Sequence, residues 1–164
     1  MQSENVTRLL TLEWKNPRLI SLSKEMPTTP EAKFSRRVRE ALQHYGCAVE
    51  RIENRVNLGI PDMLVGVGDK FVMLELKVVT RGLKIDLRPH QVAFLARHSR
   101  AGRPCFVLVL YEGTTRRPGF VALYPGSRAI DLVETGISTP RDFSWPHHDV
   151  DWPALVSALS ASLP

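Results

Sequence analysis

The apolar residues that follow Thr29 recur at helical spacing and predict a first helix. Thr29 is the expected N-cap, Pro30 takes the first helical position, and Gly46 is expected to end the helix. The apolar positions of this helix are Phe34, Val38, Ala41, Leu42 and Tyr45. Helical geometry places Glu31 on the same apolar face, at the helix end, and turns Glu40 towards solvent.

A β-hairpin and further elements follow this helix. We predict a strand for "CAVERIEN" and a hairpin for "GIPDMLVGVGDKFVMLELKVV", with its turn at Gly68-Asp69. A second helix is expected after Pro89 in "HQVAFLARHSRAG", closed by Gly102. A continuous apolar run, typical of a strand in the middle of a sheet, occurs in "PCFVLVLYEG". A short strand in "GFVALYPG" and a C-terminal helix in "WPALVSALSASL" complete an order that indicates an α/β layered domain.

Periodicity divides the chain into three parts. Residues 1–28 are expected to form an N-terminal arm, because their periodicity is weak. Residues 29–125 hold the predicted core, and residues 126–164 form a C-terminal extension that ends in the terminal helix. At 164 residues, the chain is long enough for one domain with a sizeable core.

Three charged residues interrupt the otherwise apolar hairpin. Pairing about the turn places Asp62 directly opposite Glu75, and the alternation of side chains along a strand places Lys77 on the same face as Glu75. The opposite face of the second strand is wholly apolar and consists of Val72, Leu74, Leu76 and Val78. The hairpin is therefore predicted to have one core face and one face that carries the two acids and the lysine.

Two opposed carboxylates repel each other, so that either one of them takes up a proton or a cation lies between them. A hard divalent ion such as Mg²⁺ prefers oxygen ligands, which here are the carboxylates of Asp62 and Glu75 and the main-chain carbonyl of Leu76. Lys77 is then placed to orient or activate an attacking water and to offset charge on a phosphate. These residue types at this spacing outline a site for phosphodiester hydrolysis. The alternative is a surface face on which Lys77 forms salt bridges with both acids.

Glu31 is a further candidate acid for this site. Its place at the end of the buried helix face would allow it to join the two hairpin carboxylates. It is equally explained as a first-turn acid favoured by the helix dipole, and helix geometry leaves both interpretations open.

Basic residues exceed acidic ones, with 22 Lys and Arg against 17 Asp and Glu, a net charge of +5 and a pI of about 9.6. They gather in "FSRRVRE", "RIENR", "TRGLKIDLRPH", "RHSRAGR" and "TTRRPG", and several of these clusters flank the hairpin. A basic surface around a small acidic centre suits a polyanion held against a metal, whereas solvated faces are the alternative. The candidate DNA-binding residues are Arg51, Arg55, Lys84 and Arg88.

The cysteines, the histidine pair and the chain's hydropathy exclude several other classes of function. Cys47 and Cys105 lack the spacing of a metal or redox pair and are expected in the core. No carboxylate or cysteine completes a metal set with His147-His148, so a polar loop is the better interpretation. No apolar run approaches the roughly 20 residues that span a bilayer, and the N-terminus lacks the layout of a signal peptide. We therefore expect no membrane association and a cytoplasmic protein.

The hairpin resembles a known nuclease signature. "GIPD", a hairpin and then "ELK" are similar to the PD-(D/E)XK motif, here Pro61-Asp62 followed by Glu75-Leu76-Lys77. A second stretch, "LRPHQVAFL", resembles the glutamine-bearing helix of the VRR-NUC and Holliday-junction-resolvase-like branches. Small phage-encoded members of this group are also similar in "RIEN", "GIPD" and "LELKVV". The similarity covers roughly residues 30–125.

The resemblance implies a fold, a cofactor and roles for individual residues. The fold would be a restriction-endonuclease-like α/β fold, with an αβββαβ core and a mixed central sheet flanked by helices. Asp62 and Glu75 would ligate the metal, Lys77 would assist the attacking water, Glu31 would match the helical acid, and Gln91 would help to position the site. Mg²⁺ is the expected metal, and Mn²⁺ is expected to substitute for it. Without the resemblance, Gln91 is an ordinary helix-start glutamine.

The expected activity is that of a Mg²⁺-dependent endonuclease acting on branched or structured DNA, with Holliday-junction resolution as its sharpest version. Four-way junctions need two symmetric cuts, which suggests a homodimer. A phage-encoded enzyme would act in the host cytoplasm. The N-terminal arm and the C-terminal extension lie outside the resemblance, and dimerisation and junction binding are both open for them.

Other functions compete with this one. A restriction, repair or flap nuclease of the same superfamily is a related alternative. A non-catalytic nucleic-acid-binding module on a degenerate nuclease fold, or a structural interaction protein, belongs to a different class. The intact set of Asp62, Glu75 and Lys77 argues against degeneration. A carboxylate-pair glycosidase is excluded by Lys77 and by an aromatic content of 7%.

Overall fold

A six-stranded mixed β-sheet forms the centre of the protein in a computed structural model that describes residues 29–52 and 59–161. The strands lie side by side in chain order, from β1 to β6. Their bounds are β1 Ala48–Arg51, β2 Met63–Val67, β3 Lys70–Val79, β4 Cys105–Tyr111, β5 Phe120–Pro125 and β6 Phe143–Pro146. Strands β3 and β4 run parallel, and the other neighbours in this sheet are antiparallel.

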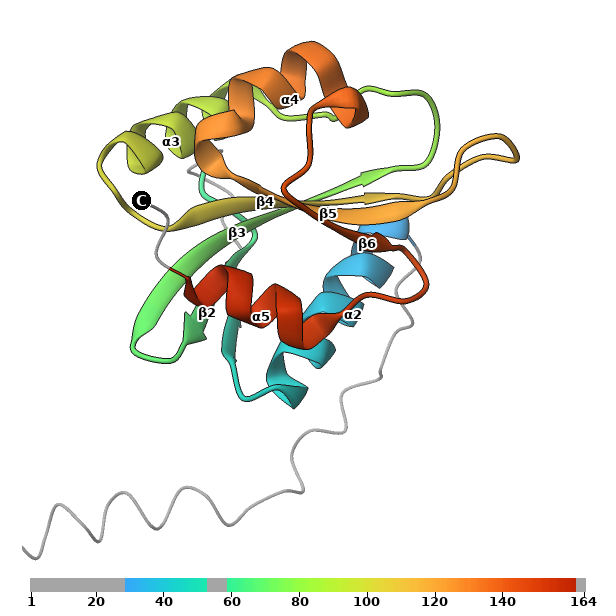
Figure 1. Cartoon of the computed structure of the whole chain (residues 1–164). Helices are drawn as coiled ribbons and strands as arrows, with labels where there is room; N and C mark the ends of the chain where they lie inside the picture. Colours follow the sequence, from blue (N-terminus) through green and yellow to red (C-terminus); the bar gives the residue numbers. More distant parts are fainter. Residues whose placement is uncertain (1–28, 53–58, 162–164) are drawn as a thin grey trace, which may run out of the picture.

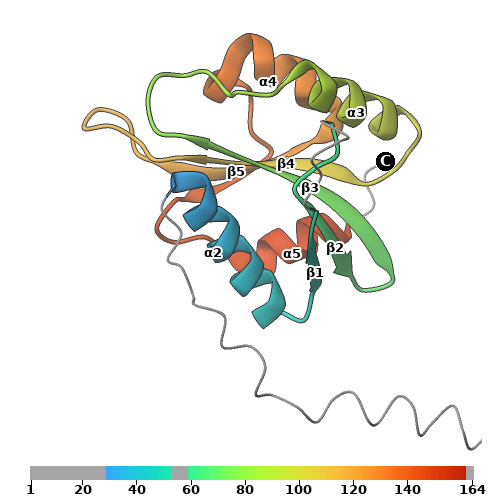
Figure 2. The ribbon, with the colours of Figure 1, turned by 180° about the vertical axis from the view of Figure 1, so that it is seen from behind.

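Helices cover both faces of the sheet (Figures 1 and 2). One face is covered by α3 (Pro89–Arg100) and α4 (Ala129–Thr135), and the opposite face by α2 (Pro30–His44) and α5 (Trp152–Ser160). The order α2-β1-β2-β3-α3-β4 is the predicted αβββαβ order. The predicted α/β class, with a mixed central sheet flanked by helices, is therefore confirmed.

Helix α2 begins and ends where its sequence predicts. The Thr29 hydroxyl accepts a hydrogen bond from the main-chain N–H of Ala32 at 3.1 Å, and Pro30 occupies the first helical position. Gly46 follows the helix with a φ of +81°, a conformation that glycine adopts without strain. Three of the predicted apolar positions are buried, namely Phe34, Val38 and Leu42. Tyr45 is an exception, since it lies beyond the helix and is 44% exposed.

The hairpin has the predicted register. Gly68 turns the chain with a φ of +60°, and Val67 pairs with Lys70, Val65 with Val72 and Met63 with Leu74. This register directs the apolar face of β3 into the core beneath α2 and α5. Because a shift by one residue would exchange the two faces of each strand, the buried side chains and the turn specify the same pairing.

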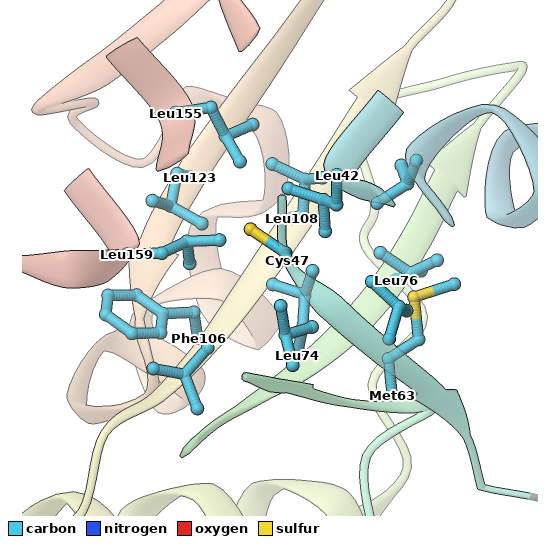
Figure 3. Close-up of a cluster of buried hydrophobic side chains, with 14 of the residues drawn as sticks. Leu42, Cys47, Met63, Leu74, Leu76, Phe106, Leu108, Leu123, Leu155 and Leu159 are labelled. Carbon is cyan, nitrogen blue, oxygen red and sulfur yellow. The ribbon is translucent and has the colours of Figure 1, made fainter. Parts of the chain in front are cut away.

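The core consists of one cluster of buried side chains on each face of the sheet. Figure 3 shows the cluster beneath α2 and α5, in which Leu42, Leu74, Leu108 and Leu155 converge from two helices and two strands. Strand β4 lies between β3 and β5, and all seven of its residues are buried, as its continuous apolar run predicts. The other cluster packs α3 and α4 against the opposite face.

Several elements beyond residue 125 were not predicted from the sequence. Helix α4 packs on α3, and β6 extends the sheet beside β5. Two short 3₁₀ helices, Gly126–Arg128 and Gly136–Ser138, flank α4. The predicted C-terminal helix is confirmed as α5, which contributes Leu155 and Leu159 to the core beneath α2. The division of the chain at residue 125 stays a prediction, and segments on its far side pack into both core clusters.

Both cysteines, Cys47 and Cys105, are buried and free, as expected of core residues. Within residues 29–52 and 59–161, no helix has the length and apolar character needed to cross a membrane.

The central strand should carry much of the stability. Leu108 is fully buried on β4, so Leu108→Ala should lower the free energy of unfolding by about 2–5 kcal/mol, measured by urea denaturation. Val133, which is 40% exposed on α4, provides the control, because Val133→Ala should change that free energy by about 0.5 kcal/mol or less. Equal effects of the two substitutions would contradict this assignment of the core.

Candidate active site

The candidate site lies where β2 begins, beside the part of β3 that extends past it. The outermost pair of these strands joins Met63, the first residue of β2, to Leu74, and beyond Leu74 the described strands pair β3 with β4 alone. Asp62 directly precedes β2, and its carboxylate Oδ2 accepts the main-chain N–H of Leu76 at 2.8 Å. The Asp62 carbonyl accepts the N–H of Ile52 at 2.8 Å, which ties the end of β1 to the same residue. Asp62 is thus held from both neighbouring strands.

This hydrogen bond also orients the main chain of Leu76. The N–H and C=O of one strand residue point to the same neighbour. Since the Leu76 N–H is directed to Asp62, the Leu76 carbonyl faces the same side of β3, beside the start of β2. The predicted main-chain oxygen donor is therefore on the same side as the Asp62 carboxylate.

Glu75 is the buried acid of the site. Its side chain is 1% exposed, and its Oε1 lies 2.8 Å from Nζ of Lys77. Its other oxygen, Oε2, is buried and has no hydrogen-bond partner among the described residues. A buried polar atom that is left unpaired costs free energy, so this oxygen is a candidate position for a ligand.

Gln91 joins the two charged residues of β3. Its Nε2 donates a short hydrogen bond to Glu75 Oε1, and its Oε1 accepts one from Lys77 Nζ at 3.1 Å. The same Oε1 accepts the main-chain N–H of Arg88 at 3.0 Å, which caps the start of α3. Gln91 therefore has the helix-start role that its position suggests, and its side chain also reaches β3.

Burial controls the protonation of Glu75. Burial, and after it the charge of Asp62, raise the pKa of Glu75 from its usual 4.5 to about 7, although the charge and hydrogen bond of Lys77 act in the opposite direction. The sequence predicts that two opposed carboxylates require either a proton or a cation. The raised pKa indicates that a proton fills this need near neutral pH when no cation is bound.

A cavity of about 540 Å³ adjoins these residues. One wall carries Asp62, Leu76 and Lys77, and the first turns of α2 supply the other wall, including the exposed Glu31. Across residues 29–52 and 59–161, no three His, Cys, Asp or Glu side chains gather closely enough to hold a metal ion. The structure thus brings Asp62 and Glu75 together and leaves Glu31 on the facing wall, and a metal-binding role of Glu31 stays a prediction.

The oxygen donors fit a hard divalent cation. They are the Asp62 carboxylate, the unpaired Oε2 of Glu75 and the Leu76 carbonyl, which are the donor types that Mg²⁺ prefers. Lys77 and Gln91 hold the other oxygen of Glu75 and leave Oε2 available. These are the donors that the sequence predicts, and their role as metal ligands stays a prediction.

Of the predicted DNA-binding residues that the structure describes, one lines this cavity. Arg51, the last residue of β1, lines it. Lys84 and Arg88 are exposed in the segment that leads to α3, whereas Arg55 lies outside the described residues. Sequence analysis did not single out Arg36 and Arg39, which line the cavity from α2. Helical spacing from Glu31 could have identified Arg39, because the two residues are eight positions apart and so lie on adjoining sides of the helix.

Comparisons with known proteins give a likeness among solved structures. No protein-family model matches the chain, and no curated protein sequence matches it. Among solved structures, the chain is similar to Archaeoglobus fulgidus Hjc, a Holliday junction resolvase from an archaeal hyperthermophile. The TM-score is 0.48 and the identity 19%, over 77% of this chain and 98% of that chain.

The raised pKa of Glu75 predicts a pH dependence of stability. The folded protein retains a proton on Glu75 that the unfolded chain releases near pH 4.5, so the stabilisation is fully present below pH 4.5 and is lost as the pH rises through about 7. Between pH 5 and pH 8 in EDTA, the free energy of unfolding should fall by about 2–3 kcal/mol more in the wild type than in Glu75→Gln. Urea denaturation at both pH values measures this difference, and parallel pH profiles of the two proteins would contradict it.

Gly59 should be needed to seat the first turn of α3. A Cβ at Gly59 would lie 2.6 Å from the carbonyl oxygen of His90, the residue before Gln91. Gly59→Ala should therefore displace this turn and lower the free energy of unfolding by about 1–3 kcal/mol. It should also reduce the part of the pH dependence of that free energy that is due to Glu75. Gly66→Ala is the control, since a Cβ there would come no closer than 3.3 Å to its nearest neighbour, a side-chain atom. Equal stability of Gly59→Ala and the wild type in urea would show that α3 does not need this contact.

Proposed function

We propose that this protein is a metal-dependent nuclease of the PD-(D/E)XK superfamily that hydrolyses phosphodiester bonds in DNA. The observation that carries the proposal is the buried Glu75 carboxylate, whose Oε2 is unpaired while its Oε1 is held by Lys77 and Gln91. A structural salt bridge would not require one carboxylate oxygen to be kept buried and unpaired beside a second acid, Asp62. A cation site would require such an oxygen, because the cation binds to it.

Asp62, Glu75 and the carbonyl of Leu76 would hold the metal, for which Mg²⁺ is the expected ion and Mn²⁺ a substitute. When bound, such an ion polarises a phosphoryl oxygen and makes water a stronger nucleophile. The residues of the chain supply the rest of the chemistry. Glu75 is buried, which excludes bulk water from this side of the site and strengthens the electrostatic interactions within it.

Lys77 would orient the attacking water and bind the phosphate. Its ammonium group lies 2.8 Å from Glu75 and 3.1 Å from Gln91, so its position is fixed by two partners, and the residue also lines the cavity. A fixed positive charge beside the scissile phosphate would stabilise the negative charge that develops in the transition state. Gln91 would act as a positioning residue, because it holds Glu75 and Lys77 in one arrangement.

The proposed substrate is branched DNA, and the sharpest version of the proposal is Holliday-junction resolution by a homodimer. The resemblance of "LRPHQVAFL" to the glutamine-bearing helix of the VRR-NUC and resolvase-like branches supports this version. The cavity supports a polyanionic substrate in general, because Arg36, Arg39 and Arg51 line it beside the catalytic residues. A dimer would supply the two symmetric cuts that a four-way junction needs.

A non-catalytic DNA-binding module is the second candidate. The observation in its favour is that the described residues hold no cluster of three potential metal-binding side chains. Such a module would bind DNA equally well after the charges of Asp62, Glu75 and Lys77 are removed, and it would not cut.

Cleavage assays decide between these functions. Labelled four-way-junction, flap, single-stranded and linear duplex DNA should be incubated with Mg²⁺ or with EDTA. Cutting should require the metal, and each of Asp62→Asn, Glu75→Gln and Lys77→Met should lower it by about 100-fold or more, because each removes a group that acts on the transition state. DNA binding by these variants should be largely retained.

Glu40→Gln is the matched control for the loss of an acid. Glu40 is exposed on the outer side of α2 and pairs with Arg36 at 2.8 Å, so its substitution should change the cleavage rate little. Paired nicks in the junction would establish a resolvase, and cutting of flaps or duplex instead would change the substrate. Tight binding without cutting under any metal would assign the protein to the binding modules.

A further inference from the structure

The connection between β4 and β5 forms a basic arm, which we define as residues 112–119. Thr114 and Arg117 exchange main-chain hydrogen bonds of 2.7 and 3.3 Å, and the Thr114 hydroxyl accepts the N–H groups of Arg116 and Arg117 at 3.3 and 3.1 Å. This closed turn holds two exposed arginines at the tip. Figure 1 shows the arm projecting beyond the end of the sheet, on the right of the view.

The base of the arm is tightly packed. A Cβ at Gly113, which has a φ of +88°, would lie 2.9 Å from the Cα of Gly119, so the two sides of the arm touch through bare backbone. A Cβ at Gly119 would in turn collide with the ring of His147, whose main-chain N–H donates to the Gly119 carbonyl at 3.3 Å. The arm is therefore fixed against the segment that follows β6.

A cavity of about 1150 Å³ lies between the arm and residues 137–148. Two arginines line it from opposite sides, Arg117 on the arm and Arg141 ahead of β6. The Arg141 guanidinium lies 4.0 Å from the ring centre of Phe120, a stacking that fixes the plane of the group and leaves its N–H edges for a ligand. Neither arginine forms an ion pair with a described carboxylate, although Glu112 is also part of the lining.

This cavity and the candidate active site belong to the same end of the sheet. The N–H of Glu112, where the arm begins, donates to the carbonyl of Val79 at 3.1 Å, and Val79 lies two residues beyond Lys77 on β3. Strand β5 lies two strands from β3, which corresponds to roughly 10 Å across the sheet. At a rise of about 3.4 Å per nucleotide, this separation spans about three base pairs of DNA.

We propose that the basic arm and its cavity bind the DNA phosphate backbone about three or more nucleotides from the bond that is cut. The proposal rests on the proposed nuclease function. Arg117 and Arg141 present planar guanidinium groups that donate two hydrogen bonds to one phosphate. Arg116 at the tip extends the positive surface outward, so that DNA contacts the protein on both sides of Lys77: at Arg36, Arg39 and Arg51 near β1, and at the arm near β5.

The test measures how DNA binding depends on salt. Binding of a four-way junction and of a linear duplex should be measured in EDTA, which prevents metal-dependent cutting, from 50 to 300 mM salt. Each phosphate contact that is lost reduces the slope of log K against log salt by about 0.9. Arg117→Gln/Arg141→Gln should therefore reduce the slope by about 2 and weaken binding about 10-fold or more at low salt, on at least one of the two substrates.

The matched control removes two charges at the opposite end of the sheet. Arg100, the last residue of α3, and Arg103, shortly before β4, are both exposed, and Arg100→Gln/Arg103→Gln has the same change of net charge. Its slope should equal that of the wild type. A slope for Arg117→Gln/Arg141→Gln that equals the control on both substrates would overturn the proposal.

Two further measurements separate this proposal from folding effects and from the nuclease function. If loss of the stacking on Phe120 lowers the melting temperature of the double variant, Arg116→Gln/Arg117→Gln at the exposed tip should still reduce the slope by about 1–2. An unchanged slope in this tip variant would also overturn the proposal. Because binding is measured without metal, a reduced slope in a protein that never cuts DNA would retain the backbone site and reject the nuclease.

Discussion

The whole site depends on one hydrogen bond, from the N–H of Leu76 to the carboxylate of Asp62, at the point where β2 begins. It takes the place of the next main-chain bond of the hairpin, and among the described strands β3 continues past this point paired with β4 alone. The side chain that ends the pairing is also one of the two acids of the site. The residue that closes the pairing of β2 with β3 and the proposed cation ligand are therefore the same residue, so that a change of Asp62 alters both.

Glu75 is held in a state that is unfavourable for the empty protein. It is buried beside a second carboxylate, which raises its pKa to about 7, and one of its oxygens has no hydrogen-bond partner in the described part of the chain. Lys77 and Gln91 offset part of this cost, since both contact the remaining oxygen. Gln91 can hold these groups because it lies in the first turn of α3, where the main-chain N–H of Arg88 donates to its side-chain oxygen Oε1. The first turn of α3 thus contacts β3 at this segment, and the first turn of α2 faces the same segment across the cavity.

The surface around this segment is basic on both sides. Arginines of α2 and β1 line the cavity at Asp62, and arginines of the arm and of the segment before β6 line the larger cavity near β5. These arginines come from four separate elements of the chain. The sequence shows them only as scattered basic residues, and it is the fold of the sheet that brings them to the same end of the protein. A polyanion that extends across this end of the sheet would meet positive charge on either side of Lys77.

Local sequence determined the elements whose signals lie within a few residues. The cap at Thr29, the turn at Gly68 and the alternation along β3 predicted α2, the hairpin register and the shared face of Glu75 and Lys77. Gln91 was assigned to the site through a family resemblance, whereas its contacts with Glu75 and Lys77 come from the packing of α3 on the sheet. Helix α4 and strand β6 escaped prediction because α4 is seven residues long and β6 four, and both are stabilised by neighbours rather than by their own periodicity. Only the tertiary structure decided that Glu31 stays exposed on the facing wall and that Arg117 and Arg141 share a cavity, because such distances depend on how separate elements pack and leave no periodic signal in the chain.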